Sequence, residues 1–276
     1  MITKQKRKCC TIVIGLILAC PLMAWAAIDI NSLELPQPDF GLEWSEELQQ
    51  DLEEAILNAG KTKYLEKKVA YHLDFIKKYP LAHVSLIMRG RVGVLYTQMD
   101  RFEDARNIIN DAKLVAGTNG YVNMLDVIYA NVDMADNKLQ QAETTLLSVM
   151  NRPAPNFLED RHTVEAISFL APIFLADVYA RTNRAKEADQ LLKKCSELAL
   201  TLTRQNPNID WLPSLFTRAC YERIRIAYGA NSDISDSLPI VEEVRINLPE
   251  FAGQKGYANV RRMIAITDRH LATEKP

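Results

Sequence analysis

The chain has 276 residues, of which 48% are hydrophobic and 25% are charged, with 33 basic and 35 acidic side chains. This is the composition of a folded globular protein, and it excludes a disordered or collagen-like chain. Glycine is scarce, at 10 residues, and aromatic residues make up 8%, which favours helices over a turn-rich sandwich or barrel. The near-neutral balance, with no long basic cluster beyond the first eight residues, gives no electrostatic footprint for nucleic acid.

The amino terminus has the three parts of a secretory leader. A basic segment with Lys4, Lys6, Arg7 and Lys8 precedes an apolar run over 11–22, and Ala24-Trp25-Ala26 follows. This order predicts a signal peptide over residues 1–26, and its apolar run is shorter than the about 20 residues of a transmembrane helix. We therefore expect an exported, periplasmic protein with no integral membrane domain after leader removal, an uncleaved anchor being the alternative.

Cys20 gives a second interpretation of this leader. The stretch Ile17-Leu18-Ala19-Cys20 is similar to a bacterial lipobox, in which the cysteine is lipidated, so a membrane-anchored lipoprotein is the alternative localisation. Ile17, Leu18 and Pro21 depart from the usual pattern, which favours cleavage after Ala26. Cleavage there leaves 29 basic and 35 acidic residues, a net charge of −6, and only two of the five cysteines.

The mature chain begins with an extended arm and continues as a series of helices. Residues 27–44 form the predicted arm, because Pro36, Pro38 and Gly41 interrupt any helical periodicity. Ser45 is the predicted N-cap of the first helix. Apolar periodicity and the proline and glycine breakers then predict helices over 45–58, 62–79, 82–98, 101–115, 120–136, 138–150, 163–182, 184–204, 213–229, 236–247 and 255–272. Pro172 should kink or split the 163–182 helix.

The same five positions recur in successive helix pairs. The template has a small residue and an aromatic residue one turn apart on the first helix, and a small, a large apolar and another small residue on the second, because helices that cross at about 8–10 Å need small side chains there. The copies are Gly93, Tyr96, Ala105, Ile109 and Ala112; Ala130, Asp133, Ala142, Leu146 and Val149; Ala176, Tyr179, Ala188, Leu192 and Cys195; and, more faintly, Arg225, Tyr228, Ser237, Val241 and Val244. Asp133 departs from the aromatic residue in the second copy, and in the fourth Arg225 replaces the small residue and Ser237 the alanine.

This arrangement resembles the tetratricopeptide repeat (TPR), whose helix-turn-helix unit has small residues where its helices touch. The resemblance covers about residues 45–250. It implies an all-α, right-handed solenoid of about four to five helix-turn-helix units with a C-terminal capping helix over 255–272, and thus a TPR-like domain over 45–273. An unrelated helical bundle is the alternative.

No catalytic signature accompanies the helices. The common hydrolase, metalloprotease, phosphate-loop and C-x-x-C motifs are absent from the sequence, and we expect no catalytic residue, no metal site and no cofactor. Glu159, Asp160 and Glu165 are interpreted as a solvated helix amino terminus rather than as an acid–base cluster.

Cys195 and Cys220 remain after the leader is removed. In the repeat register they lie on faces of neighbouring units that meet, so a disulfide between them is one interpretation. Two small buried thiols are the other.

The resemblance also implies a concave surface lined by the first helices of the units. The positions predicted to line it are Ile87, Val94, Met124, Val127, Asn131, Leu170, Ile173 and Asp177. Such a surface suits an extended or helical peptide from a partner. The alternatives are that these residues contact one another, or that the arm fills the surface with Leu33, Leu35, Phe40 and Trp44.

The expected function is that of an exported scaffold or adaptor that binds a protein or peptide partner in the bacterial cell envelope. One alternative is a small-ligand binder or enzyme with a site around Asn131, Asp177 and Arg181. The other is a purely structural envelope element tethered through Cys20 or an uncleaved leader.

Overall fold

The computed structural model describes residues 45–153, 161–209, 211–230, 238–251, 253 and 256–273. Within these ranges the chain is helical and contains no strand, which confirms the predicted all-α class. The predicted signal peptide and arm lie outside the described residues. The chain divides into two compact units, residues 1–115 and 116–276.

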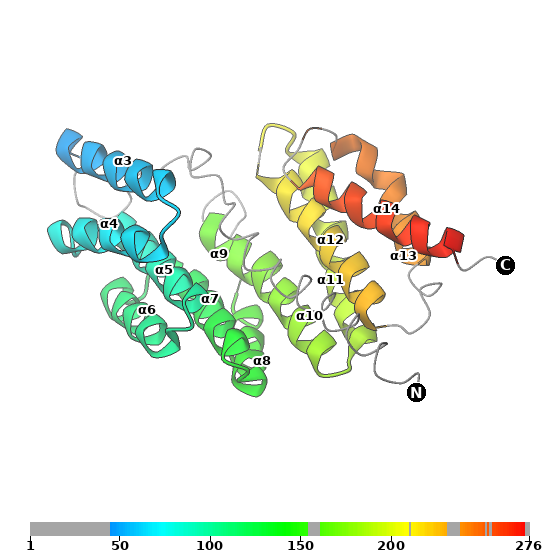
Figure 1. Cartoon of the computed structure of the whole chain (residues 1–276), viewed down its shortest axis with the longest axis horizontal. Coiled ribbons are helices and arrows are strands. Elements are labelled where there is room, and N and C mark those ends of the chain that lie inside the picture. The colour runs from blue at the N-terminus through cyan, green and yellow to red at the C-terminus, as the bar shows by residue number, and fades with distance from the viewer. Residues whose placement is uncertain are drawn as a thin grey trace, which may run out of the picture. The chain divides into compact units, whose positions relative to one another are not determined.

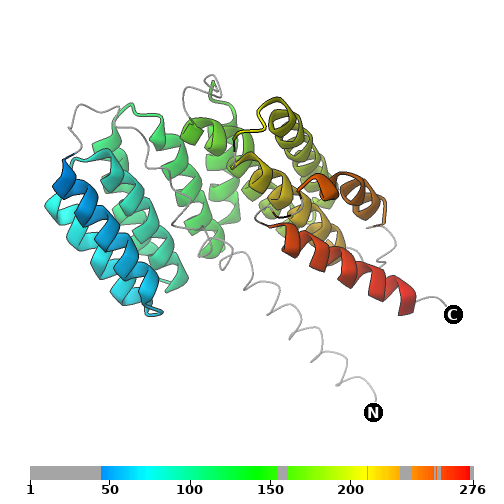
Figure 2. The same ribbon diagram turned by 90° about the horizontal axis from the view of Figure 1, so that it is seen from above.

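The first unit consists, in its described part, of α3 (Glu46–Lys61), α4 (Leu65–Lys78), α5 (His83–Gln98) and α6 (Phe102–Ala116), which lie side by side (Figures 1 and 2). Ser45 caps α3 as predicted, because its hydroxyl accepts a hydrogen bond from the Leu48 N–H at 3.1 Å. The core of this unit includes Leu52, Phe75 and Met88, drawn from α3, α4 and α5.

Gly93 of α5 lies against Ile109 of α6. A Cβ atom at Gly93 would lie 2.8 Å from Cγ1 of Ile109, and Ala105 and Ile109 are fully buried. The predicted crossing positions of this pair are therefore confirmed, since the spacing leaves no room for a larger side chain.

The second unit contains α7 (Tyr121–Ala135), α8 (Leu139–Met150), α9 (Arg161–Glu165), a π-helix (Ala166–Leu170), α10 (Ala171–Arg181), α11 (Ala185–Gln205), α12 (Leu212–Ala230), α13 (Leu238–Asn247), a 3₁₀ turn (Leu248–Phe251) and α14 (Tyr257–Thr273). Helix α10 packs on α8 and α11, and α12 packs on α11 and α14. Ala130, Ala142, Ala176 and Ala188 are fully buried, as their predicted place at helix crossings requires.

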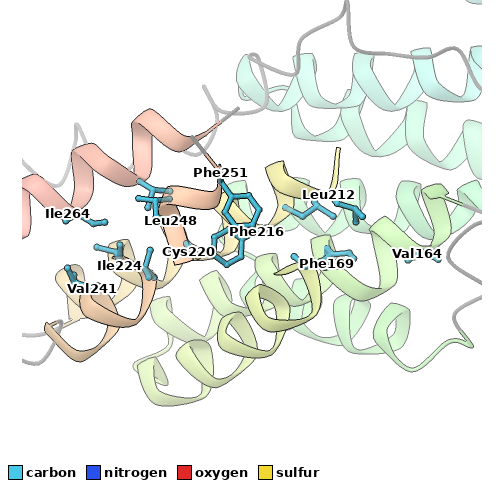
Figure 3. Packing of buried hydrophobic residues seen from close by; sticks show 14 residues of the cluster. Val164, Phe169, Leu212, Phe216, Cys220, Ile224, Val241, Leu248, Phe251 and Ile264 are labelled. Carbon is cyan, nitrogen blue, oxygen red and sulfur yellow. The ribbon is translucent and has the colours of Figure 1, made fainter. Parts of the chain in front are cut away.

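A large apolar core joins the carboxyl-terminal helices of this unit. Figure 3 shows Phe216 of α12 against Phe251 of the 3₁₀ turn, and the two rings stack with their centroids 4.2 Å apart. Val241 of α13 and Ile264 of α14 join the same cluster. The core thus holds α12, α13 and α14 together.

Three helical hairpins, α5–α6, α7–α8 and α10–α11, share one turn. In each the residue at the bend has a positive φ, 57°, 59° and 62° in chain order, at Asp100, Asn137 and Asn183. The residue after the bend donates its N–H to the carbonyl five residues earlier, at 2.7–2.9 Å. This is a Schellman-type ending, and Asp and Asn tolerate the left-handed conformation better than most non-glycine residues. The three hairpins are therefore alike in backbone geometry as well as in sequence.

An arginine after the bend stabilises two of these turns. Arg184 stacks on the Tyr179 ring at 3.6 Å and bonds to Glu187 and to Glu143, each at 2.7 Å. Glu143 belongs to α8, so this arginine ties one hairpin to the preceding one. The equivalent residue of the first hairpin, Arg101, stacks on a tyrosine at 4.5 Å and pairs with Asp104 and with an acidic residue of α4.

One helical stretch among the described residues, Arg161–Arg181, is long and apolar enough to cross a membrane by length and composition. Its most apolar window is 78% buried inside the protein. That burial is what a core helix of a folded unit shows.

Two glycines of the first unit give opposite predictions. Gly93→Ala should destabilise the protein by about 1 kcal/mol or more, because the new Cβ overlaps Ile109 and overpacking outweighs the gain in helix propensity. Gly60→Ala in α3 meets nothing within 4 Å and should stabilise it by about 0.5–1 kcal/mol. Urea unfolding measures both; equal effects of the two substitutions would contradict the crossing.

His72 makes the stability of the first unit dependent on pH. It is 4% exposed, and burial, with help from Arg91 and Lys68, lowers its pKa from 6.5 to about 4. Below pH 6.5 the unfolded chain binds a proton that the folded state does not, so the free energy of unfolding falls as the pH drops towards 4. At about 1.4 kcal/mol per pKa unit the loss approaches ~3 kcal/mol. His72→Leu should flatten this part of the stability profile in urea titrations at pH 7 and pH 4.5.

Candidate functional site

The residues predicted to line a concave surface are mostly interior. Seven of them, Ile87, Val94, Met124, Val127, Leu170, Ile173 and Asp177, are no more than 9% exposed, and Asn131 alone among the eight is partly exposed. These seven residues, six of them apolar, therefore lie in the interior and not on the open surface that was expected. The first helices α5, α7 and α10 are covered along most of their length, so their apolar positions are used in helix packing.

Charged side chains from α10 and α12 form an ion-pair network, in which Asp177, Glu222 and Arg225 are 11–12% exposed and Arg181 is 33% exposed. Asp177 accepts a hydrogen bond from Arg225 of α12 at 2.5 Å and pairs with Arg181 at 2.9 Å. Arg225 also pairs with Glu222 at 2.5 Å. The predicted site residue Asp177 thus joins two neighbouring helices through an ion pair.

The same surface continues towards the start of α9. Glu165 lies 3.8 Å from Arg161, and Arg161 stacks on the Trp211 ring at 4.9 Å. Arg218 of α12 lies 5.4 Å from the ring of Phe174. We call this surface the ion-pair face, and define it as Arg161, Glu165, Phe174, Asp177, Arg181, Trp211, Arg218, Glu222 and Arg225.

Arg218 differs from the other cations of the ion-pair face. Among the described residues it forms no hydrogen bond and no ion pair within 4 Å, although it is only partly accessible to solvent. Burial lowers the pKa of Arg218, against the opposing effect of Glu222 and Glu165. A desolvated guanidinium without a hydrogen-bond acceptor is costly, and a carboxylate that reaches it would be bound strongly.

Glu165 is the matching acidic group. Burial raises its pKa, and Arg161 and Arg218 oppose that rise. Its side chain is 22% exposed, so it is strongly desolvated and still reachable from solution. The sequence-based interpretation of Glu165 as a solvated helix terminus is therefore wrong.

The π-helix explains how Glu165 comes to share a face with Asp177. In a regular α-helix, twelve residues of separation place two side chains about 120° apart. A π-turn holds one additional residue, which removes about 100° of that difference. Pro172, at the start of α10, lies directly after the π-turn and cannot donate a backbone hydrogen bond to it, so the expected interruption of this helix is confirmed.

Cys195 of α11 bonds to the π-turn that interrupts the helix before Pro172. Its thiol lies 3.8 Å from the carbonyl oxygen of Ser168 and donates to it. Ser168 is in the turn to which Pro172 offers no N–H, so the cysteine supplies a donor that the backbone lacks. This role was not foreseen from the sequence.

Cys195 and Cys220 are free, buried thiols in the structure. This agrees with the interpretation of two small buried residues and not with a disulfide. Burial raises the pKa of each to about 12, which keeps both protonated and unreactive. Cys20, the candidate for lipidation, lies outside the described residues.

Other kinds of site have little basis in the described part of the chain. No group of three or more His, Cys, Asp or Glu residues there is placed to hold a metal ion. A partly open pocket of about 30 Å³, lined in part by Phe216, Cys220 and Arg223, has room for about one water molecule.

The comparisons with known proteins give no relative. No protein family, no curated protein and no solved structure matches the chain.

The bond between Cys195 and Ser168 can be tested through its dependence on Pro172. Cys195→Ala should destabilise the protein by about 1–2 kcal/mol, through the lost donor and the lost volume. In a Pro172→Ala background, where residue 172 has an N–H, the cost should be smaller. Urea unfolding of the two single variants and the double variant measures this coupling. An equal cost in both backgrounds would show that Cys195 serves only to fill space.

Proposed function

We propose that this protein is an exported, TPR-like scaffold of the bacterial cell envelope that binds a protein or peptide partner through the ion-pair face. The support for a repeat protein is internal. Three hairpins share crossing residues, the left-handed bend and the bonded turn. In a TPR-like solenoid such hairpins stack in one direction, and α10 packs on the helices before and after it within the second unit.

Arg218 is the observation that carries the binding role. The nearby cations Arg181 and Arg225 each have a carboxylate within 3 Å, and Arg218 has none among the described residues. Its side chain lies beside Phe174, and Arg161 lies on Trp211 close by. Arginine next to aromatic rings is the composition typical of interaction hot spots.

The chemistry of this face favours a partner segment that presents a carboxylate. Such a group would pair with Arg218 and replace solvent as the hydrogen-bond acceptor of its guanidinium. Glu165 lies near Arg218, so the partner segment could also carry a positively charged group that pairs with Glu165. The proposed partner is therefore a peptide segment.

The proposed compartment is the periplasm, on the basis of the leader over residues 1–26. A lipoprotein anchored through Cys20 is the alternative, and palmitate labelling of Cys20 separates the two. A small-ligand site around Asp177 and Arg181 has less support, because these two side chains are paired with each other and with Arg225.

Co-purification from envelope extracts tests the proposed partner binding. Arg218→Ala should lose the partner recovered with the unmodified protein, and Arg218→Lys should retain it in part because the positive charge remains. Arg245→Ala is the matched control, since Arg245 is a half-exposed arginine that pairs with Asp268 away from this face. Recovery of the same proteins with the Arg218 and Arg245 variants would refute binding at the ion-pair face.

A further inference from the structure

A basic and aromatic strip runs along the exposed side of α4 in the first unit. We call it the α4 strip, and define it as Lys61, Lys63, Tyr64, Lys67, Tyr71 and Lys77. Tyr64, Lys67 and Tyr71 follow one another at three to four residues and share one face of the helix, Lys61 and Lys63 precede α4, and Lys77 lies in its last turn. Tyr64 is 58% exposed and Tyr71 36%, and both tyrosines line a shallow depression in the surface.

The lysines of this strip are not neutralised by the first unit. Among the described residues, none of its lysines forms an ion pair, and Lys63 and Lys67 instead each lie 5.5 Å from the Tyr64 ring centroid. Lys78, one residue beyond the strip, bonds to Glu47 and Asp51 at 2.8 and 2.5 Å. The exposed acidic residues of α4 are Glu66, which pairs with Arg101 at 3.4 Å, and Asp74. Unpaired positive charge beside exposed rings suits an acidic segment that also carries apolar side chains.

We propose that the α4 strip binds residues 28–44 of the same chain. This segment contains Asp29, Glu34, Asp39 and Glu43 and no lysine or arginine. Its apolar residues, Leu33, Leu35, Phe40 and Trp44, supply side chains for the two tyrosines. The charges of segment and strip are therefore opposite, and both surfaces have apolar groups between their charges.

The attachment point of the segment fits this placement. Residue 44 is joined to Ser45 at the start of α3, and the bond between Lys78 and Glu47 puts that start beside the carboxyl end of α4. With 14 residues, α4 is about 21 Å long. An extended segment covers about 30 Å between Glu43 and Glu34. The acidic residues from Glu43 to Glu34 can thus reach the lysines of the strip along its whole length, from Lys77 to Lys63.

Residues 28–44 are covalently attached to the first unit, and this favours them over a separate protein as the segment that binds the α4 strip. A segment tethered next to its site acts at an effective concentration of about millimolar, above that of a free envelope protein with the same charge. The inference concerns the first unit and does not rest on the ion-pair face of the second.

Zero-length carbodiimide coupling of the full chain, expressed with its own leader, tests the proposal. This reagent joins a lysine to a carboxylate that touches it, and the bond between Lys78 and Glu47 is the internal positive control. Mass spectrometry should find Glu34, Asp39 or Glu43 coupled to Lys63, Lys67 or Lys77. A mixture of isotope-labelled and unlabelled protein should give these couplings within single copies.

A double substitution provides the matched comparison. Lys63→Gln with Lys67→Gln should weaken the coupling of the segment to Lys77, because the segment loses two of its contacts, and leave the Lys78 coupling intact, which also shows that the first unit has folded. Lys186→Gln with Lys194→Gln removes two exposed lysines elsewhere and should change nothing. The proposal is overturned if the control couples while the segment does not, or if the segment couples only between copies.

Discussion

Burial of the first helices is the constraint on which the polar organisation of the protein depends. Because α5, α7 and α10 are covered along most of their length, a charge on them must find a partner or remain costly. Asp126 of α7 pairs with Arg152 at 2.7 Å, and Asp177 of α10 pairs with two arginines. The rule extends to α12, whose Arg223, 2% exposed, bonds to Asp189 and Glu243. Among the described residues, Arg89 of α5, which is 7% exposed and has a buried Nη1 without a hydrogen-bond partner, and Arg218 of α12 are exceptions to this pairing.

The hairpin turn shows how a degenerate repeat can keep its geometry while its sequence changes. In the first and third hairpins an arginine after the bend stacks on a tyrosine. In the middle hairpin Asp133 replaces the tyrosine and Lys138 the arginine, and Lys138 pairs with Asp136 instead. The backbone bond from Lys138 to Asp133 is nevertheless kept, at 2.7 Å. The left-handed bend, and not the side-chain stack, is thus the part common to all three.

Sequence periodicity was sufficient for the helices and for their crossing points, because both follow from local spacing and from small residues. The described helices agree with the predicted ranges to within about three residues at most ends, and Ala105, Ala142 and Ala188 are fully buried. Exposure could not be predicted in the same way. It depends on how many neighbours cover a helix, so Val127 and Ile173 belong to the interior while Glu165, interpreted as solvated, is desolvated. The role of Cys195 depends on a carbonyl 27 residues away and has no local signal.

Pro172 connects these observations. A proline inside a core helix removes a backbone donor, and here the chain absorbs the loss with a π-turn before it and a thiol from α11 beside it. The additional residue of that turn rotates α9 relative to α10, and this rotation brings Glu165 towards the face that carries Asp177. A sequence reading that assumes one uninterrupted helix from 163 to 182 assigns these two residues to different faces. The interruption that breaks the regular helix is therefore also what assembles the charged surface beside Arg218.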